Sequence, residues 1–171
     1  MGAGEDLKIL LVKEKTTITE LANLANQVSD KKYTVYGLSQ KIVFKNSDNS
    51  EEPVYVSGSV YLYGTDINLS LHCQDLYAYS TNDLTLDSLS NIERDVRLSA
   101  HKFNMYGTIG RNAFINVSDI SLVNGDQKGF IQGNLSYTNH QAIDVPEDLV
   151  GGEITFNLKA LDNTPTWLKN L

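Results

Sequence analysis

The chain has 171 residues, of which 41% are apolar and 20% charged, so it is long enough for one cored domain and too apolar for a disordered polypeptide. Its net charge of -7 argues against nucleic acid or an anionic lipid surface as its main partner. Cys73 is the single cysteine, which excludes an intrachain disulfide and a zinc site built from cysteines. The sequence holds no phosphate-binding loop, Gly-x-Ser-x-Gly motif or hexapeptide acyltransferase repeat, so we expect neither an enzyme nor a bound cofactor.

The first 45 residues differ in charge from the rest of the chain. They carry seven lysines against five acidic residues, whereas residues 46–171 carry seven basic residues against sixteen acidic ones. Apolar residues fall at helical spacing in the stretches Leu7–Leu11 and Ile18–Val28, which predicts two short helices. We expect residues 1–32 to form a helical cap or appendage that covers one open end of the following domain.

A second interpretation of the same segment is a DNA-binding unit. The string from Leu7 to Ile42 is similar to small helix-turn-helix domains through its Thr-Glu-Leu-Ala and Gly-Leu-Ser-Gln-Lys-Ile pieces. That similarity implies a recognition helix over Tyr33–Ile42 in a regulator whose remaining chain is a sensor or oligomerisation domain. The helix would place these side chains near phosphates and bases: Lys31, Lys32, Ser39, Gln40 and Lys41. These residues also fit the first unit of a repeat, and the two assignments exclude each other.

That repeat recurs seven times between Val35 and Leu158. In each copy apolar and polar residues alternate, and a second apolar pair follows about seven residues after the start. The copies are VYGLSQKIVF, VYLYGTDINL, LYAYSTNDLTL, VRLSAHKFNM, AFINVSDISL, LSYTNHQAIDV and ITFNL, and they begin at Val35, Val60, Leu76, Val96, Ala113, Leu135 and Ile154. Their starts step by 25, 16, 20, 17, 22 and 19 residues.

A unit of this length cannot bury its own apolar face, so the repeat predicts a solenoid of stacked units. The alternation is typical of strands with one buried face, and segments such as Gly107–Gly110 supply a third short strand. The fold class is therefore all-β, a parallel β-helix of about six to seven coils over residues 33–160 with a tail over 161–171. A hairpin sandwich would need two-residue turns of the Asn-Gly kind, and only Asn124-Gly125 fits, inside an insertion.

Polar residues mark the corners of the predicted coils. A turn-forming residue precedes most units: Asp75, Asp95, Asn112 and Asn134, with Ser59 and Glu153 as weaker variants. Because Asp75 and Asp95 share a position in adjacent coils, their carboxylates are either plain turn residues or a calcium site. Two polar insertions, Lys45–Pro53 and Val123–Lys128, are expected to be surface loops.

Two groups of ring-bearing side chains also suggest surface roles. The three histidines, His72, His101 and His140, fall in different units, and we expect them to be solvated surface residues. Alternation turns several tyrosines outward, where they either line an aromatic stripe for a partner or a glycan or reflect ordinary strand composition. The tyrosines concerned are Tyr36, Tyr55, Tyr61, Tyr63, Tyr77, Tyr79 and Tyr137.

The units from Val54 to Phe156 resemble the bactofilins, the polymer-forming cytoskeletal proteins of bacteria. The resemblance is carried by RDVRLSAHKFNMYGTIGRNAFINVSDISL (Arg94–Leu122) and IQGNLSYTNHQAIDVPEDLVGGEITF (Ile131–Phe156). It implies a right-handed parallel β-helix that assembles end to end into filaments without nucleotide. It further implies a cytoplasmic or membrane-associated location in a bacterium and a scaffold role for envelope proteins.

We therefore expect a non-catalytic scaffold whose partner is another copy of itself. The expected contact residues are the apolar rungs at the two ends of the rod: Val35, Ile42 and Phe44 on one side, and Ile154, Phe156 and Leu158 on the other. Two alternatives remain, the DNA-binding regulator and an extracellular carbohydrate-binding or carbohydrate-active β-helix.

Overall fold

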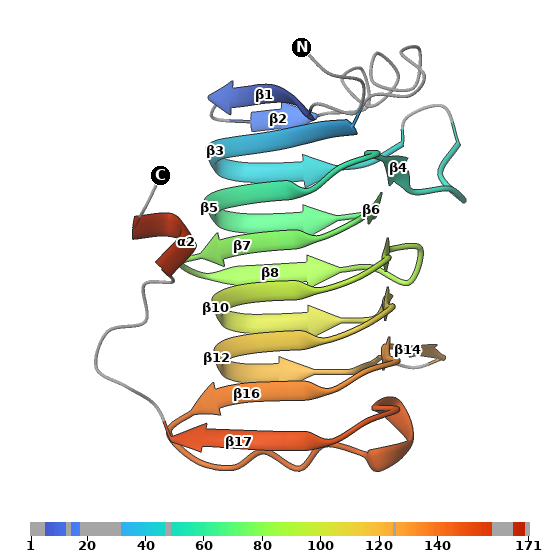
Figure 1. Cartoon of the computed structure of the whole chain (residues 1–171), viewed down its shortest axis with the longest axis vertical. Coiled ribbons are helices and arrows are strands. Elements are labelled where there is room, and N and C mark those ends of the chain that lie inside the picture. Colours follow the sequence, from blue (N-terminus) through green and yellow to red (C-terminus); the bar gives the residue numbers. More distant parts are fainter. Residues whose placement is uncertain are drawn as a thin grey trace.

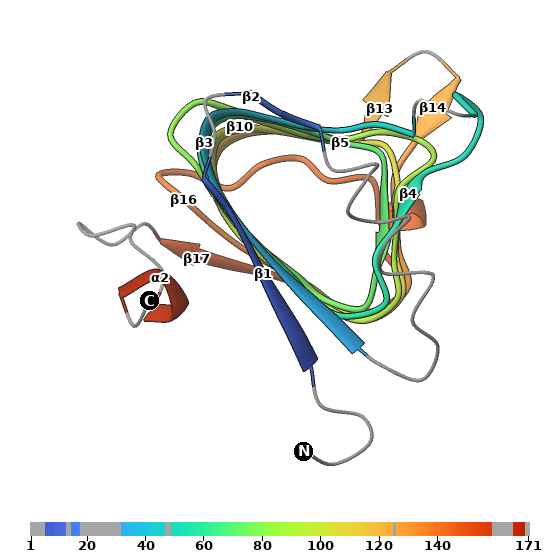
Figure 2. The same cartoon turned by 90° about the horizontal axis from the view of Figure 1, so that it is seen from above.

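The chain winds into a stack of parallel strands with a triangular outline when seen from one end (Figure 1, Figure 2). This computed structural model describes residues 6–12, 15–17, 32–46, 49–124, 126–158 and 166–169, and for residues 6–40 it describes the backbone alone. The strands form a ten-stranded and a five-stranded sheet, and every pairing within these two sheets is parallel. The predicted parallel β-helix is confirmed.

The ten-stranded sheet wraps around two sides of the triangle, and the five-stranded sheet forms the third (Figure 2). The first sheet contains β1 (Asp6–Val12), β2 (Lys15–Thr17), β3 (Lys32–Phe44), β5 (Val60–Leu69), β7 (Leu76–Ser80), β8 (Asp83–Leu86), β10 (Val96–Met105), β12 (Ala113–Ser121), β16 (Leu135–Asn139) and β17 (Ile154–Leu158). The second contains β4 (Val54–Tyr55), β6 (Leu71–Cys73), β9 (Asn91–Ile92), β11 (Thr108–Ile109) and β15 (Phe130–Ile131). A hairpin of β13 (Val123–Asn124) and β14 (Gln127–Lys128), a 3-10 turn η1 (Glu147–Leu149) and a short helix α2 (Thr166–Lys169) complete the described elements.

The register of the coils matches the repeat read from the sequence. Val35 pairs with Val60, Val60 with Leu76, and Leu76 with Val96. The same column continues downward through Ala113, Leu135 and Ile154. Each predicted unit start is therefore the first rung position of its coil, and the insertions that vary the step between 16 and 25 residues lie at the corners.

The core runs along the axis of the triangle, because alternate side chains of every strand point inward. In β10, Val96, Leu98, Phe103 and Met105 are buried, whereas Arg97 between them is exposed. Equivalent inward positions stack from coil to coil and form one continuous apolar cluster from Ile42 to Val150 among the residues with described side chains. Each coil in the middle of the stack thus has its apolar side chains covered by the coils before and after it.

Glycines at one corner permit the close approach of successive coils. The backbone N–H of Gly133 donates to the carbonyl oxygen of Arg111 at 2.7 Å, and that of Gly110 donates to Ile92 at 2.7 Å. A Cβ atom on Gly133 would overlap the Arg111 carbonyl oxygen, and one on Gly110 would overlap that of Glu93. At these two positions it is therefore the lack of a side chain that lets successive coils come so close.

The N-terminal segment corrects two expectations. The stretch Leu7–Leu11 is strand, not helix: β1 pairs with β3 over seven residue pairs, from Asp6 opposite Lys32 to Val12 opposite Leu38. A short apolar run fits either helix or strand, and the ladder offered by β3 decides in favour of strand. The second expected helix, Ile18–Val28, lies outside the described residues.

The recognition helix expected over Tyr33–Ile42 is also wrong. These residues belong to β3, which pairs with β5 from Val35 opposite Val60 to Phe44 opposite Leu69. A helix cannot make this ladder, so the backbone from Lys32 to Lys41 is not that of a recognition helix, and Lys31 lies outside the described residues.

The two insertions lie where the sequence placed them, at corners of the rod. Residues 49–52 are exposed, and they turn back through a hydrogen bond of 3.2 Å from the Glu52 N–H to the Asn49 carbonyl oxygen. The second insertion is more regular than a loop, since β13 and β14 form an antiparallel pair that projects from the triangle (Figure 2).

Candidate interaction surfaces

The last coil forms an open end of the rod. β17 pairs with β16 on one side, from Ile154 opposite Leu135 to Leu158 opposite Asn139, and has no second partner within the described part of the chain. All five of its residues are exposed, including Leu158 at 75%. Phe156 continues the inward column below Tyr137, with their ring centroids 5.4 Å apart. The end therefore presents inward-type apolar side chains and one unpaired strand edge together.

The opposite end differs from expectation, because Val35, Ile42 and Phe44 are not terminal. Val35 pairs with Ile9 of β1, and Ile42 pairs with Thr16 of β2. Ile42 and Phe44 are each only 1% exposed. The sequence analysis missed this because β1 and β2 lack the repeat pattern and Leu7–Leu11 has helical spacing, yet the two strands add a further layer above β3 (Figure 1).

One corner carries a ladder of side-chain acceptors at the predicted turn positions. Asp75 Oδ1 accepts the backbone N–H of Asp95, and Asp95 Oδ1 accepts that of Asn112, both at 3.0 Å. Asn112 Oδ1 and Asn134 Oδ1 accept the N–H groups of Asn134 and Glu153 in the same way, both at 2.9 Å. Each Asp or Asn thus bonds the equivalent residue of the next coil, so the turn residues stitch the coils together.

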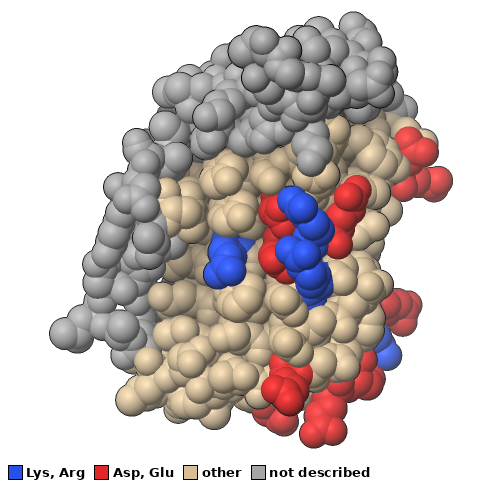
Figure 3. Space-filling model, viewed as in Figure 1, with Lys and Arg blue, Asp and Glu red and all other residues tan. Residues whose placement is uncertain are grey.

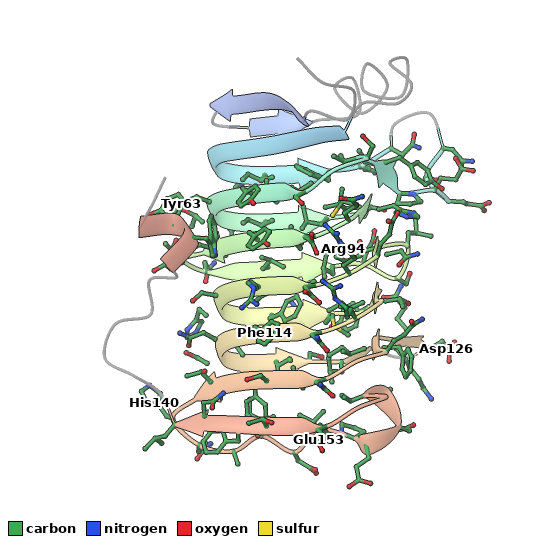
Figure 4. The ribbon with its side chains drawn as sticks, in the orientation of Figure 1. Tyr63, Arg94, Phe114, Asp126, His140 and Glu153 are labelled. Atoms are coloured by element: carbon green, nitrogen blue, oxygen red, sulfur yellow. The ribbon has the colours of Figure 1, made fainter. Side chains whose placement is uncertain are left out.

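Arginines pair with the two aspartates of this ladder. Figure 3 shows basic and acidic side chains side by side on this face, and Figure 4 labels Arg94. Arg94 donates a hydrogen bond to the carboxylate of Asp75. Arg111 binds Asp95 with two hydrogen bonds, from Nε to Oδ1 at 2.9 Å and from Nη2 to Oδ2 at 2.7 Å. The hydrogen bond from Arg111 lowers the pKa of Asp95, helped by the Asn112 N–H and opposed by partial burial. Both carboxylates are therefore engaged by backbone and guanidinium donors, which favours a structural role over calcium binding. In the residues that the structure describes, no three metal-ligating side chains gather.

Four of the predicted tyrosines form two outward columns on the face that contains β5 and β7. Tyr61 stacks on Tyr77 with centroids 4.5 Å apart and planes 4° apart, and Tyr63 stacks on Tyr79 at 5.4 Å and 9°. In each pair the two rings cover each other's faces. A bound sugar would need such a ring face to pack against. The arrangement therefore gives little support to a glycan-binding stripe.

The remaining aromatic positions divide between inside and outside. Below Tyr77 the first column continues with Arg97 and Phe114, and the Arg97 guanidinium carbon lies 4.0 Å from the centre of the Phe114 ring. Tyr137 points inward, contrary to expectation, and its hydroxyl accepts the Ile143 N–H at 2.9 Å and donates to the Ile143 carbonyl at 3.2 Å. Tyr55 lies on another side beside His72, and the side chain of Tyr36 is outside the description.

The histidines and the cysteine do not converge on a site. His72 lies 3.0 Å from Glu93 through Nε2, whereas His101 and His140 are exposed in other coils, His140 at the far end of β16 from the arginine corner (Figure 4). Cys73 is fully buried; burial, and to a lesser degree the nearby Asp75 and Glu93 charges, raise the pKa of its thiol well above the usual value. A thiol in this environment stays protonated and inert.

A hollow of about 200 Å³ opens where residues 49–53 turn back over β3 and β5. Its lining mixes the apolar Phe44 and Leu69 with the polar Asn46, Glu52 and Asp87.

Comparison with known proteins adds no assignment: no family model matches the chain, and neither a curated protein nor a solved structure gives a match. No helix in the described ranges is both long and apolar enough to cross a bilayer.

Proposed function

We propose that this protein is a bactofilin-like, polymer-forming scaffold that associates with copies of itself through the ends of its β-helix and catalyses no reaction. Two observations support this proposal, the sequence resemblance of Val54–Phe156 to the bactofilins and the parallel β-helix itself. The observation that carries it is the open last coil, in which all five residues of β17 are exposed.

The physical argument rests on what β17 leaves unsatisfied. An edge strand presents a row of backbone N–H and C=O groups that a further strand can bond. Ile154, Phe156 and Leu158 lie at inward positions of the repeat. A second rod stacked on this end would therefore cover them in the way that one coil covers the next inside the rod. Backbone hydrogen bonding to an added strand and burial of apolar side chains thus both favour association at this end of the rod.

The geometry of the other end decides what kind of assembly forms. β1 is the outermost strand of the described stack on that side, so contact through the N-terminal end is assigned to β1 instead of Val35, Ile42 and Phe44. Joining β17 of one copy to β1 of the next is a heterologous contact and yields an open filament. Joining β17 to β17 is isologous and stops at a dimer unless the β1 ends also pair.

The resemblance also supplies the proposed setting. We place the scaffold in the bacterial cytoplasm or at its membrane and envelope, with envelope or membrane-associated proteins as clients. The net charge of -7 disfavours nucleic acid as a partner.

Negative-stain electron microscopy of the purified protein tests the proposal, with filaments or end-to-end dimers as the expected result. Leu158→Lys places a charge on the open end at a position that is 75% exposed in the single chain, so it should abolish these species without affecting the fold. Phe130→Lys is the matched control, because Phe130 is an exposed apolar residue on the side of the rod. Single particles from the unaltered protein, or equal assembly by both variants, would contradict the proposal.

A further inference from the structure

The helix α2 lies against the outside of the rod over β5 and β7, several coils away from the strand that precedes it in sequence (Figure 1, Figure 2). Trp167 contacts two tyrosines in an edge-to-face arrangement, with centroid distances of 5.9 Å to Tyr61 and 6.1 Å to Tyr77 and interplanar angles of 61° and 64°. Since these two tyrosines also stack on each other, the indole and the two phenol rings contact one another within the described residues. Such pairs attract beyond their simple burial of area.

The length of the connection indicates that contact, and not the tether, holds α2 at this place. β17 lies four ladder steps from β7 and five from β5, or about 19 and 24 Å along the stack. The eight Cα steps from Leu158 to Thr166 reach at most about 26–29 Å. The helix therefore sits near the limit of its reach, on a particular pair of rings.

The contact is nevertheless weak enough to open. α2 has four residues, far fewer than a helix needs to be stable by itself. The indole N–H of Trp167 is buried and finds no acceptor among the described groups, which costs free energy while the helix is docked. The covalent connection offsets this, because it keeps the helix and the two rings in one molecule at an effective concentration of at most about millimolar.

We propose that the Tyr61–Tyr77 pair is a docking site for a short tryptophan-bearing helical segment, and that the chain's own α2 fills it as a displaceable cover. A partner segment with one tryptophan and an acceptor for its indole N–H would compete for the same two rings. The inference does not depend on end-to-end assembly, because the site lies on the side of the rod.

Fluorescence reads this contact directly, since Trp167 is the single tryptophan of the chain. The double variant Tyr61→Ala/Tyr77→Ala should shift the emission to longer wavelength and increase quenching by acrylamide. The matched control is Tyr63→Ala/Tyr79→Ala, which removes the neighbouring stacked pair and should leave the emission unchanged. Circular dichroism checks that both variants keep the sheet. Unchanged emission in the first variant, or equal shifts in both, would overturn the proposal.

A peptide of residues 159–171 tests the site in trans. The full chain carrying Trp167→Ala has no tryptophan, so the peptide alone fluoresces when the two are mixed. We expect a saturable shift to shorter wavelength with half-saturation below about 1 mM, because a weaker site would not stay closed in cis. The shift should vanish when Tyr61→Ala/Tyr77→Ala is added. No saturation in that range would overturn the proposal, and an emission of the unaltered chain that changes on dilution would overturn the assignment of α2 to its own rod.

Discussion

Phe103 in the middle of the rod and Phe156 in the last coil both occupy inward positions, although in different columns of the stack, and their surroundings differ. Phe103 is 0% exposed because coils lie above and below it, whereas Phe156 is 38% exposed because β17 has a neighbour on one side within the described chain. The alternation within a strand decides which side chains point inward, but neighbouring coils are needed to bury them. The exposed apolar surface of a solenoid therefore lies at its ends.

The corner ladder shows the same contrast in hydrogen bonds. Asp95 receives a bond from the coil below and gives its own N–H to the coil above. Glu153, at the matching place in the last coil, gives its N–H to Asn134, and its exposed side chain bonds no further coil among the described residues. The side-chain hydrogen bonds between coils and the packing of inward apolar side chains both end at the last described coil, which contains β17.

The largest expected effect is a difference in stability between alanine variants of the two phenylalanines. Phe103→Ala should lower the free energy of unfolding by about 3–5 kcal/mol, because it leaves a cavity in a closed core. Phe156→Ala should cost well under half of that in dilute solution, since its ring is partly solvated already. Urea denaturation at low protein concentration measures both, and equal losses would show that the last coil is as enclosed as the middle.

A smaller difference in stability is expected between alanine variants of the corner residues Asp95 and Glu153. Asp95→Ala removes the acceptor of the Asn112 N–H and should destabilise the fold by about 1–3 kcal/mol. Glu153→Ala removes no ladder acceptor and should change stability by less than about 0.5 kcal/mol. If thermal unfolding ranks them in the opposite order, the side-chain ladder is not what joins the coils.

The smallest effect is a pH dependence that belongs to Asp95. Its pKa is lowered in the folded chain, so its carboxylate stabilises the fold above the unfolded-state pKa of about 3.9, and this contribution is lost as the pH falls through the folded-state pKa. Asp95→Asn keeps a ladder acceptor but cannot titrate. The stability difference between the unaltered protein and this variant should be constant near neutral pH and shrink below about pH 4. Unfolding curves at several pH values check this, and a difference that is independent of pH would remove the role assigned to Arg111.

The sequence predicted the register of the stack because the same apolar alternation specifies every coil. Each unit start from Val35 to Ile154 is paired with the next. The inward position of Tyr137 follows from its parity with buried Leu135, although we expected it among the tyrosines that alternation turns outward. The ladder residues Asp75 and Asp95 were found, but for their turn-forming tendency and not for the bonds they make between coils.

Other features were beyond the reach of a single sequence. β1 has an apolar run too short to distinguish strand from helix, and its state depends on the edge that β3 offers. The contact of Trp167 with Tyr61 and Tyr77 joins residues about a hundred positions apart and follows no repeat. Interactions of this kind arise from the three-dimensional stack and leave no local pattern.

The most direct test of the central claim is sedimentation of the unaltered protein and of Leu158→Lys over a wide range of concentrations. The account predicts that the average mass of the unaltered protein rises with concentration, whereas the variant stays at the mass of a monomer. A monomer at every concentration in both proteins would contradict the claim that the open last coil is a site of self-association.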